Sequence, residues 1–176
     1  MLRALTLLAL LALLLAATPP RAEAVVSEQD LKAVLFYKLP LFVYRAMADK
    51  EARLGICALG ATPLENAMDS LPVTLVDGRG VDFRMLQSAA EAGACDFIFI
   101  GRSEAGRLES HLRRLGGRRL VTVSDIDGFA RAGGMVEFAL RPDGSGVQLL
   151  INRKAARQQG IEFNAQLLRL ARIVEP

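Results

Sequence analysis

Short apolar runs that alternate with helical segments fill the middle of this sequence. The runs have the length of strands and lie at 53–60, 81–86, 96–100 and 119–124. The segments between them have helical or alanine-rich character and lie at 63–70, 87–94 and 104–115. Strands separated by helices are typical of βα units, which build a parallel sheet through right-handed crossovers. The pattern therefore predicts an α/β domain with a mainly parallel sheet.

The end of the chain predicts a hairpin and a closing helix. Residues 135–141 and 147–153 flank the turn-rich loop PDGSG, which is typical of a β-hairpin. Asn164 is a good N-cap, and the helix after it repeats apolar residues on one face at Leu167, Leu170, Ala171 and Val174. We therefore expect a single three-layer α/β domain, with a mainly parallel sheet, a C-terminal antiparallel hairpin and helices on both faces.

An amphipathic helix is expected before the first strand. Ser27 to Asp30 resemble a capping box, and apolar residues recur at helical spacing over 28–48. Pro40 lacks an N–H and clashes with the preceding turn, so we expect a kink or a break there. The apolar face of this helix suits the core or a dimer interface.

The N-terminus has the pattern of a secretory signal peptide. A basic start precedes the apolar run 4–17, and Ala22-Glu23-Ala24 fits the small-x-small cleavage site. A retained transmembrane anchor is the alternative, but crossing the hydrocarbon needs roughly 20 apolar residues and Pro19 ends the run too early. We expect a signal peptide over 1–24 and a mature domain over 25–176, outside the cytoplasm and not inserted in the membrane.

Composition narrows the chemistry that the chain can perform. Cys57 and Cys95 form an even pair, which in an oxidising compartment is a candidate disulfide, with two buried free thiols as the alternative. The only histidine, His111, has no evident catalytic partner and is expected on the solvated surface. No GxSxG elbow or metal-ligand spacing is present, so we expect no catalytic residue, cofactor or metal.

Charged clusters are expected to be structural. The net charge of +3 is mild, and the local basic cluster brackets a predicted helix end at Arg113, Arg114, Arg118 and Arg119. Cations suit the last turn of a helix, and no aromatic residues interleave with them, so nucleic acid is not an expected partner. A carboxylate site at Asp125, Asp127 and Glu137 is conceivable, but aspartates in a turn commonly bind their own backbone.

The loop GFARAGG, residues 128–134, is the best candidate for recognition. Its three glycines permit unusual dihedral angles and let it present Phe129 and Arg131. An aromatic residue with an arginine nearby is a good anchor for a protein partner. The alternative is that Phe129 is a buried plug.

Several segments together resemble the YfiR/HmsC-like family of periplasmic proteins. They are LKAVLFYKLPLFV, ICALG, ACDFIFIG, LVTVSDIDGFARAGGMVEF, INRKAARQQGI and NAQLLRLARIV. The resemblance implies a regulator, not an enzyme, which acts on the periplasmic sensor portion of an inner-membrane diguanylate cyclase. Such a repressor lowers cyclic di-GMP output and biofilm formation and is commonly a homodimer. The family's cysteine-bearing strands match here, which implies a structural or redox-sensitive disulfide between Cys57 and Cys95.

A second function remains open beside the repressor. The loops at the carboxyl edge of a parallel sheet are a common place for ligands. The protein can therefore also be a periplasmic module that binds a small ligand and acts as a sensor.

Overall fold

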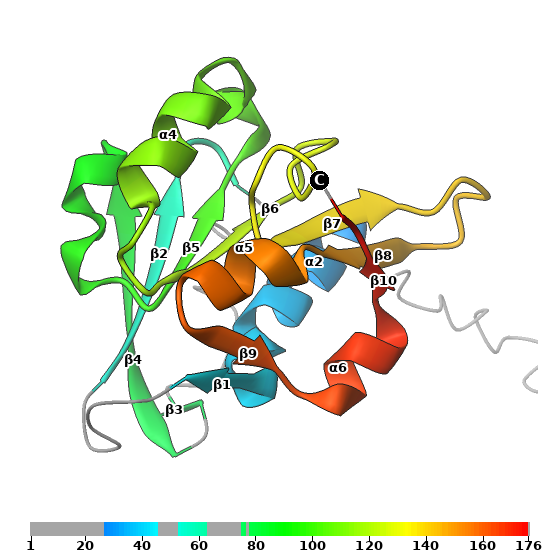
Figure 1. Cartoon of the computed structure of the whole chain (residues 1–176), viewed down its shortest axis with the longest axis horizontal. Helices are drawn as coiled ribbons and strands as arrows, with labels where there is room; N and C mark the ends of the chain where they lie inside the picture. The colour runs from blue at the N-terminus through cyan, green and yellow to red at the C-terminus, as the bar shows by residue number, and fades with distance from the viewer. Residues whose placement is uncertain (1–26, 46–52, 63–74, 77, 176) are drawn as a thin grey trace, which may run out of the picture.

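The computed structural model describes residues 27–45, 53–62, 75–76 and 78–175 (Figure 1). The predicted signal peptide at 1–24 and the predicted helix at 63–70 lie outside these residues. No helix in the described part of the chain is both long and apolar enough to cross a membrane.

A mixed sheet forms the centre of the fold. Its strands are β2 (Leu54–Leu59), β3 (Leu75–Val76), β4 (Arg79–Leu86), β5 (Phe97–Ile100), β6 (Val121–Ser124), β7 (Val136–Leu140), β8 (Val147–Ile151) and β10 (Arg172–Ile173). They are ordered β10-β8-β7-β6-β5-β2-β4-β3. The pairs β4·β2, β2·β5, β5·β6 and β6·β7 are parallel, whereas β7 and β8 form an antiparallel hairpin. The predicted fold class, a mainly parallel α/β sheet with a C-terminal hairpin, is confirmed.

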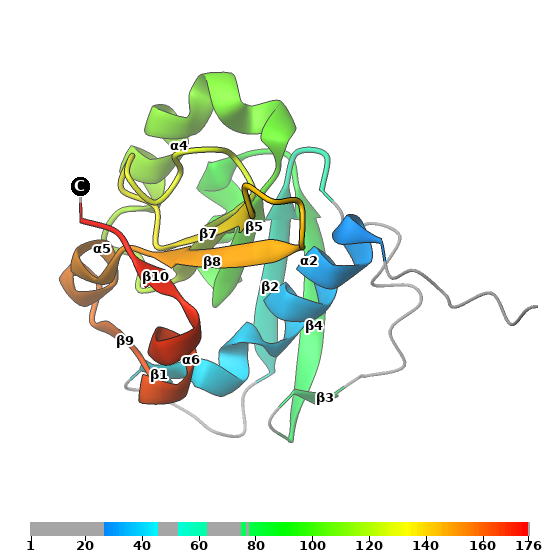
Figure 2. The ribbon, with the colours of Figure 1, turned by 90° about the vertical axis from the view of Figure 1, so that its right-hand side faces the viewer.

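Helices cover both faces of this sheet. They are α2 (Glu28–Lys38), α4 (Leu108–Leu115), α5 (Arg153–Gln158) and α6 (Ala165–Leu170), with 3₁₀ segments η1 (Leu39–Phe42), η2 (Ala89–Ala94) and η3 (Arg102–Arg107). Successive side chains of a strand point to opposite faces, so β5 contributes to two cores. Phe99 packs in the core under α2, and Ile98 packs in the core under α4. In Figure 2 the strands lie between these two helices.

The first helix is shorter than the predicted span 28–48. Ser27 caps α2, as expected, because its Oγ accepts a hydrogen bond from the Asp30 N–H. The helix ends at Lys38, and the predicted break at Pro40 is confirmed, since Pro40 lies in the 3₁₀ segment η1. The predicted continuation of the helix is wrong over Val43–Arg45, and its last residues, 46–48, lie outside the described part of the chain. Residues Val43–Arg45 form strand β1, which pairs with β9 (Ile161–Phe163) from the other end of the chain.

The closing helix is also shorter than its apolar pattern suggests. Asn164 is its cap, as predicted, because Oδ1 accepts a hydrogen bond from Leu167 N at 2.8 Å. The chain leaves the helix after Leu170 because Ala171 is extended and the next residues pair with β8 as β10. Leu167 and Val174 are buried, but Leu170 is 70% exposed. The prediction that Leu170 faces the core is therefore wrong.

A disulfide joins Cys57 of β2 to Cys95, two residues before β5. The sulfur atoms are bonded and the Cα atoms lie 5.8 Å apart. Because β2 and β5 are neighbours in the sheet, the bond links two strands that already pair. The alternative of two free thiols is wrong.

Candidate partner-binding surface

The loop after β6 is closed by hydrogen bonds rather than extended into solvent. The Glu137 carboxylate, buried on β7, accepts hydrogen bonds from Gly128 N at 3.0 Å and Ala130 N at 2.9 Å. Gly134 N donates to Phe129 O at 3.0 Å. Gly128 has a φ of +81°, which a residue with a side chain rarely adopts. Glu137 therefore fixes the backbone of the loop and is not free for acid-base chemistry.

Phe129 and Arg131 occupy different environments in this loop. The Phe129 side chain is 0% exposed and belongs to the core under α4. Its ring lies directly over Gly134, where an added Cβ would approach a ring carbon to 2.1 Å. Arg131 is exposed. Phe129 therefore has the position of a buried plug, which was the alternative interpretation of the sequence. Of the two residues, only Arg131 presents its side chain at the surface.

Changing Glu137 to glutamine is expected to lower the free energy of unfolding by about 2 kcal/mol. A hydrogen bond to a charged acceptor contributes about 1.5–3 kcal/mol, and the neutral amide offers one oxygen where the carboxylate offers two. Urea denaturation measures the change. Glu162→Gln is the control, because Glu162 is exposed and should stay within about 0.5 kcal/mol of wild type. Equal stability of the two variants would show that Glu137 does not hold the loop.

Asn152 connects this loop to helix α5. Its Nδ2 donates to Ala130 O at 2.8 Å, and its Oδ1 accepts from Ala155 N at 2.9 Å as the cap of α5. Its own N–H donates to Met135 O. Because Asn152 is only 1% exposed, these bonds are shielded from water. They hold the loop that carries Arg131 in a fixed relation to α5.

The exposed side of α5 is basic, and we call it the α5 surface: Arg153, Lys154 and Arg157. Within the part of the chain that the structure describes, none of these three side chains makes a hydrogen bond or an ion pair. Other exposed arginines do, for example Arg53 with Asp82 and Arg107 with Glu104. The charge of the α5 surface is therefore available to a partner.

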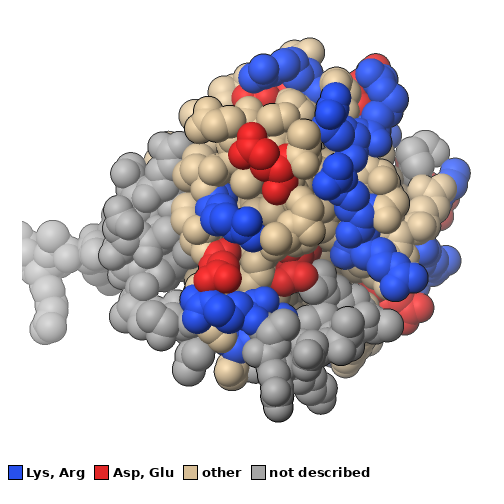
Figure 3. Space-filling view, turned by 90° about the vertical axis from the view of Figure 1, so that its left-hand side faces the viewer, with Lys and Arg blue, Asp and Glu red and all other residues tan. Residues whose placement is uncertain are grey.

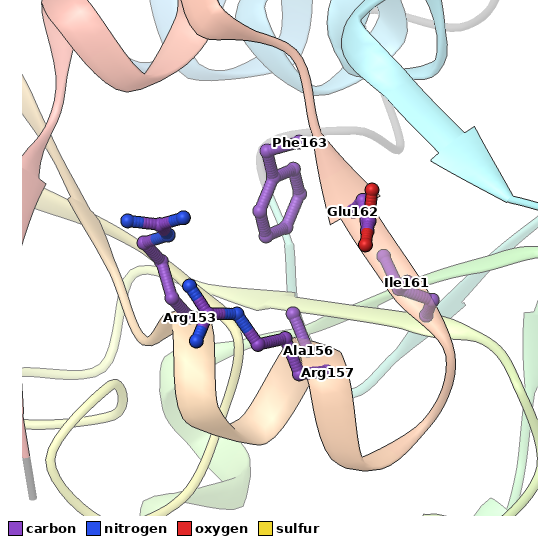
Figure 4. A pocket seen from close by; sticks show the side chains of 6 residues that line it. All are labelled: Arg153, Ala156, Arg157, Ile161, Glu162 and Phe163. Carbon is purple, nitrogen blue, oxygen red and sulfur yellow. The ribbon is translucent and has the colours of Figure 1, made fainter.

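Two hollows flank this surface. The first, of about 250 Å³, lies between α5 and β9 and is lined by Arg153, Ala156, Arg157, Ile161, Glu162 and Phe163. Figure 4 shows both guanidinium groups on one side of it and the Phe163 ring across from them. The second, of about 640 Å³, lies between α5 and the C-terminal segment and shares both arginines. Arginine beside apolar surface is typical of the anchoring part of a protein interface.

The other predicted charged groups are engaged within the protein. Asp125 contacts Lys32 Nζ at 3.0 Å and Arg102 Nε at 3.3 Å, and Asp127 contacts Arg102 Nη2 at 3.2 Å. With Glu137 bound to the loop backbone, these three acids form no common carboxylate site. The described residues contain no group of three or more His, Cys, Asp or Glu placed to hold a metal.

His111 is not the solvated residue that the sequence predicts. Its Nε2 lies 2.7 Å from Glu104 Oε2, and the His111 side chain is 12% exposed. The cause is local: the chain enters α4 through η3, and this turn buries Glu104 beside the helix. Glu104 also binds Arg107, so its carboxylate has two basic contacts.

The basic cluster near the end of α4 lies on the surface, as expected. Arg113 and Arg114 are in the last turn of the helix, and Arg118 Nε donates to the Arg114 carbonyl. All four arginines of the cluster are exposed. Figure 3 views the side of the molecule that carries α4 and shows basic side chains in a band along it.

The sequence interpretation missed the α5 surface, although a signal was present. The segment RKAAR places three cations within one and a half turns and has no acid at helical spacing to neutralise them. It missed the Lys32–Asp125 pair for a different reason. These residues are 93 positions apart, and no local pattern links them.

These features define a class of protein: an α/β domain with a mainly parallel sheet, a disulfide across its central strands and a basic surface on its C-terminal half. More particularly, the chain belongs to the YfiR/HmsC-like family, whose model matches residues 29–172. No curated protein matches the sequence.

Solved structures share the fold at low sequence identity. A conserved domain protein from Vibrio cholerae has a TM-score of 0.55 at 13% identity, over 84% of this chain and 60% of that chain. The ABC domain in complex with L-Trp from Streptococcus pneumonia has a TM-score of 0.53 at 13% identity, with the same coverage. The chain thus spans about 60% of the length of these proteins. At this identity the likeness concerns the fold alone.

Proposed function

We propose that this protein is a periplasmic negative regulator that binds the periplasmic sensor region of an inner-membrane diguanylate cyclase. Binding lowers cyclic di-GMP signalling and biofilm formation, and the protein has no enzymatic activity of its own. Membership of the YfiR/HmsC-like family supports this role. In the proposal the segment 1–24 is cleaved on export, and the mature domain 25–176 works as a homodimer.

The α5 surface is the observation that carries the proposed contact with the cyclase. Its three cations are exposed and have no partner among the described residues, and apolar Phe163 and Ile173 line the hollows beside them. A partner segment with acidic groups and an apolar anchor matches this chemistry. Charges at an interface raise the association rate and suppress wrong partners. The loop that carries Arg131 is tied to the same helix by Asn152, so we include Arg131 in the partner-binding region.

Reversing two charges of the α5 surface, with Arg153→Glu and Arg157→Glu together, is expected to weaken binding to the sensor region at least tenfold. Both side chains are exposed and unpaired among the described residues, so stability should change by about 0.5 kcal/mol or less. Calorimetry with the purified sensor region measures affinity, and cellular cyclic di-GMP measures repression. Cyclic di-GMP should rise to the level seen when the gene is deleted.

The matched control is Arg113→Glu with Arg114→Glu on α4. This variant makes the same change of charge on a different helix, and the exposed pair between Arg113 and Glu109 contributes little to stability. It should bind and repress like wild type. If the α4 variant loses binding and the α5 variant keeps it, the cyclase contacts the surface of α4 and not the α5 surface. If gene deletion leaves cyclic di-GMP unchanged while the cyclase is expressed, the regulatory role itself is wrong.

A further inference from the structure

A crevice opens at the carboxyl edge of the parallel strands. From β2 the chain passes to β4 on one side of it and then returns to β5 on the other side. The connections that leave β2 and β5 therefore lead to opposite sides of the sheet, although their first residues are in contact through the hydrogen bond from Ala61 N to Ser103 Oγ at 2.9 Å. Such a switch point is where open α/β sheets bind ligands. A cavity of about 350 Å³ occupies this position, which is within the range of small-molecule sites.

The walls of this cavity come from four parts of the chain. Helix α2 supplies Glu28, Gln29 and Lys32, the loop after β2 supplies Ala61 and Thr62, and Arg102 and Asp125 follow β5 and β6. Lys32 is only 3% exposed, and its Nζ lies 3.0 Å from Asp125 Oδ2. Arg102 is half exposed and contacts the same oxygen. The buried lysine thus fixes the carboxylate at the wall.

The other oxygen of Asp125 is an unused acceptor. Oδ1 is buried and has no hydrogen-bond partner among the described residues. Buried acceptors are nearly always satisfied, because a lone one costs about 1–3 kcal/mol. A ligand that donates a hydrogen bond to Oδ1 would remove this cost.

The charges of the cavity favour a neutral ligand that donates hydrogen bonds. Among the residues that line the cavity, the two cations Lys32 and Arg102 are matched by two acids, Asp125 and Glu28, so a charged ligand would leave an excess of one sign there. A hydroxyl group can donate to Asp125 Oδ1 and, in the same site, accept from Arg102. The guanidinium has five N–H donors, and its contacts with Asp125 and Asp127 leave others for a ligand.

We propose that this crevice binds a small neutral polyhydroxylated ligand, a monosaccharide or a short polyol. Asp125 accepts from one hydroxyl of the ligand, and Arg102 donates to a neighbouring one. Lys32 is a positioning residue that holds Asp125. The site lies apart from the α5 surface, because the two share no lining residue. The protein is then a sensor for the ligand as well as a regulator.

The test is a titration of the purified, ¹⁵N-labelled mature protein with D-glucose, N-acetyl-D-glucosamine and D-sorbitol, followed by NMR. Saturable shifts of the amides of Ala61, Gly101 and Asp125 with at least one probe are expected. Putrescine, a cation, and sulfate, an anion, are the charged controls and should not produce them. No saturable shift with the three probes, shifts confined to other residues, or saturation with a charged control alone would overturn the proposal.

The deciding variant is Arg102→Gln, which should weaken binding of the active probe at least tenfold. Arg102 is half exposed, so the fold should be retained. Arg107→Gln is the matched control and should bind the probe like wild type, because Arg107 pairs with Glu104 outside the crevice. Asp125→Asn removes the buried carboxylate that both Lys32 and Arg102 contact, so this variant can unfold and the proposal does not depend on it. Unchanged affinity of Arg102→Gln would overturn the site. No cyclase is present in these measurements, so their failure is separate from that of the regulatory role.

Discussion

Replacing Cys57 and Cys95 together by alanine is expected to lower the free energy of unfolding by about 4 kcal/mol. The disulfide closes a loop with a sequence separation of 38 residues, which restricts the unfolded wild-type chain. The variant regains this chain entropy in its unfolded state, and the gain stabilises that state by about this amount. Native domains are stable by only about 5–15 kcal/mol, so the loss is a large part of the total. Urea denaturation of the wild type and the double variant, both without reductant, measures it.

Two controls separate the covalent bond from the packing of the sulfur atoms. Reduction of the wild-type protein should reproduce most of the loss, because it breaks the bond and keeps the side chains. The double variant should not respond to reductant. Cys57 is fully buried in the core under α4, so some of the effect comes from packing. A change below about 1 kcal/mol in both experiments would contradict the expected role of the bond.

The central strands could be predicted from sequence because they are buried on both faces. Strands β2, β5 and β6 are buried at every residue. The sequences of β2 and β5 are continuous apolar runs that local composition reveals, and β6 alternates valine with the small polar residues Thr122 and Ser124. The hairpin of β7 and β8 followed from its turn residues. These elements depend on local signals, and the structure has all of them.

The elements that sequence did not reveal depend on distant partners. Residues Val43–Arg45 continue a helical apolar pattern, but they form β1 because β9 offers hydrogen bonds from the far end of the chain. The end of α6 is set in the same way by the pairing of β10 with β8. Tertiary pairing overrides local propensity in both cases.

The candidate sites show the same division. The cations of α5 are adjacent in sequence and were visible as a pattern. The crevice requires Lys32, Arg102 and Asp125 to meet, and only the topology of the sheet brings together the helix and the two loops that carry them. Its residues therefore could not be chosen from the sequence.

The second large effect is expected in the loop after β6, residues 128–134. Phe129→Ala should lower the free energy of unfolding by about 3–5 kcal/mol. The ring is fully buried in the core under α4, so its removal leaves a cavity in that core, which also contains Ile100, Leu115 and Leu120. Arg131→Ala in the same loop is the matched control and should change stability by about 0.5 kcal/mol or less, because Arg131 is exposed.

Comparing these two variants also determines how the loop acts on a partner. Phe129→Leu keeps most of the apolar volume and should recover a large part of the stability. One outcome is that Phe129→Ala loses partner binding while Phe129→Leu and Arg131→Ala keep it. The loop then acts indirectly, by supporting the α5 surface through Asn152. If Arg131→Ala alone loses binding at wild-type stability, Arg131 contacts the partner directly. A stability change below about 1 kcal/mol for Phe129→Ala would contradict the buried position of the ring.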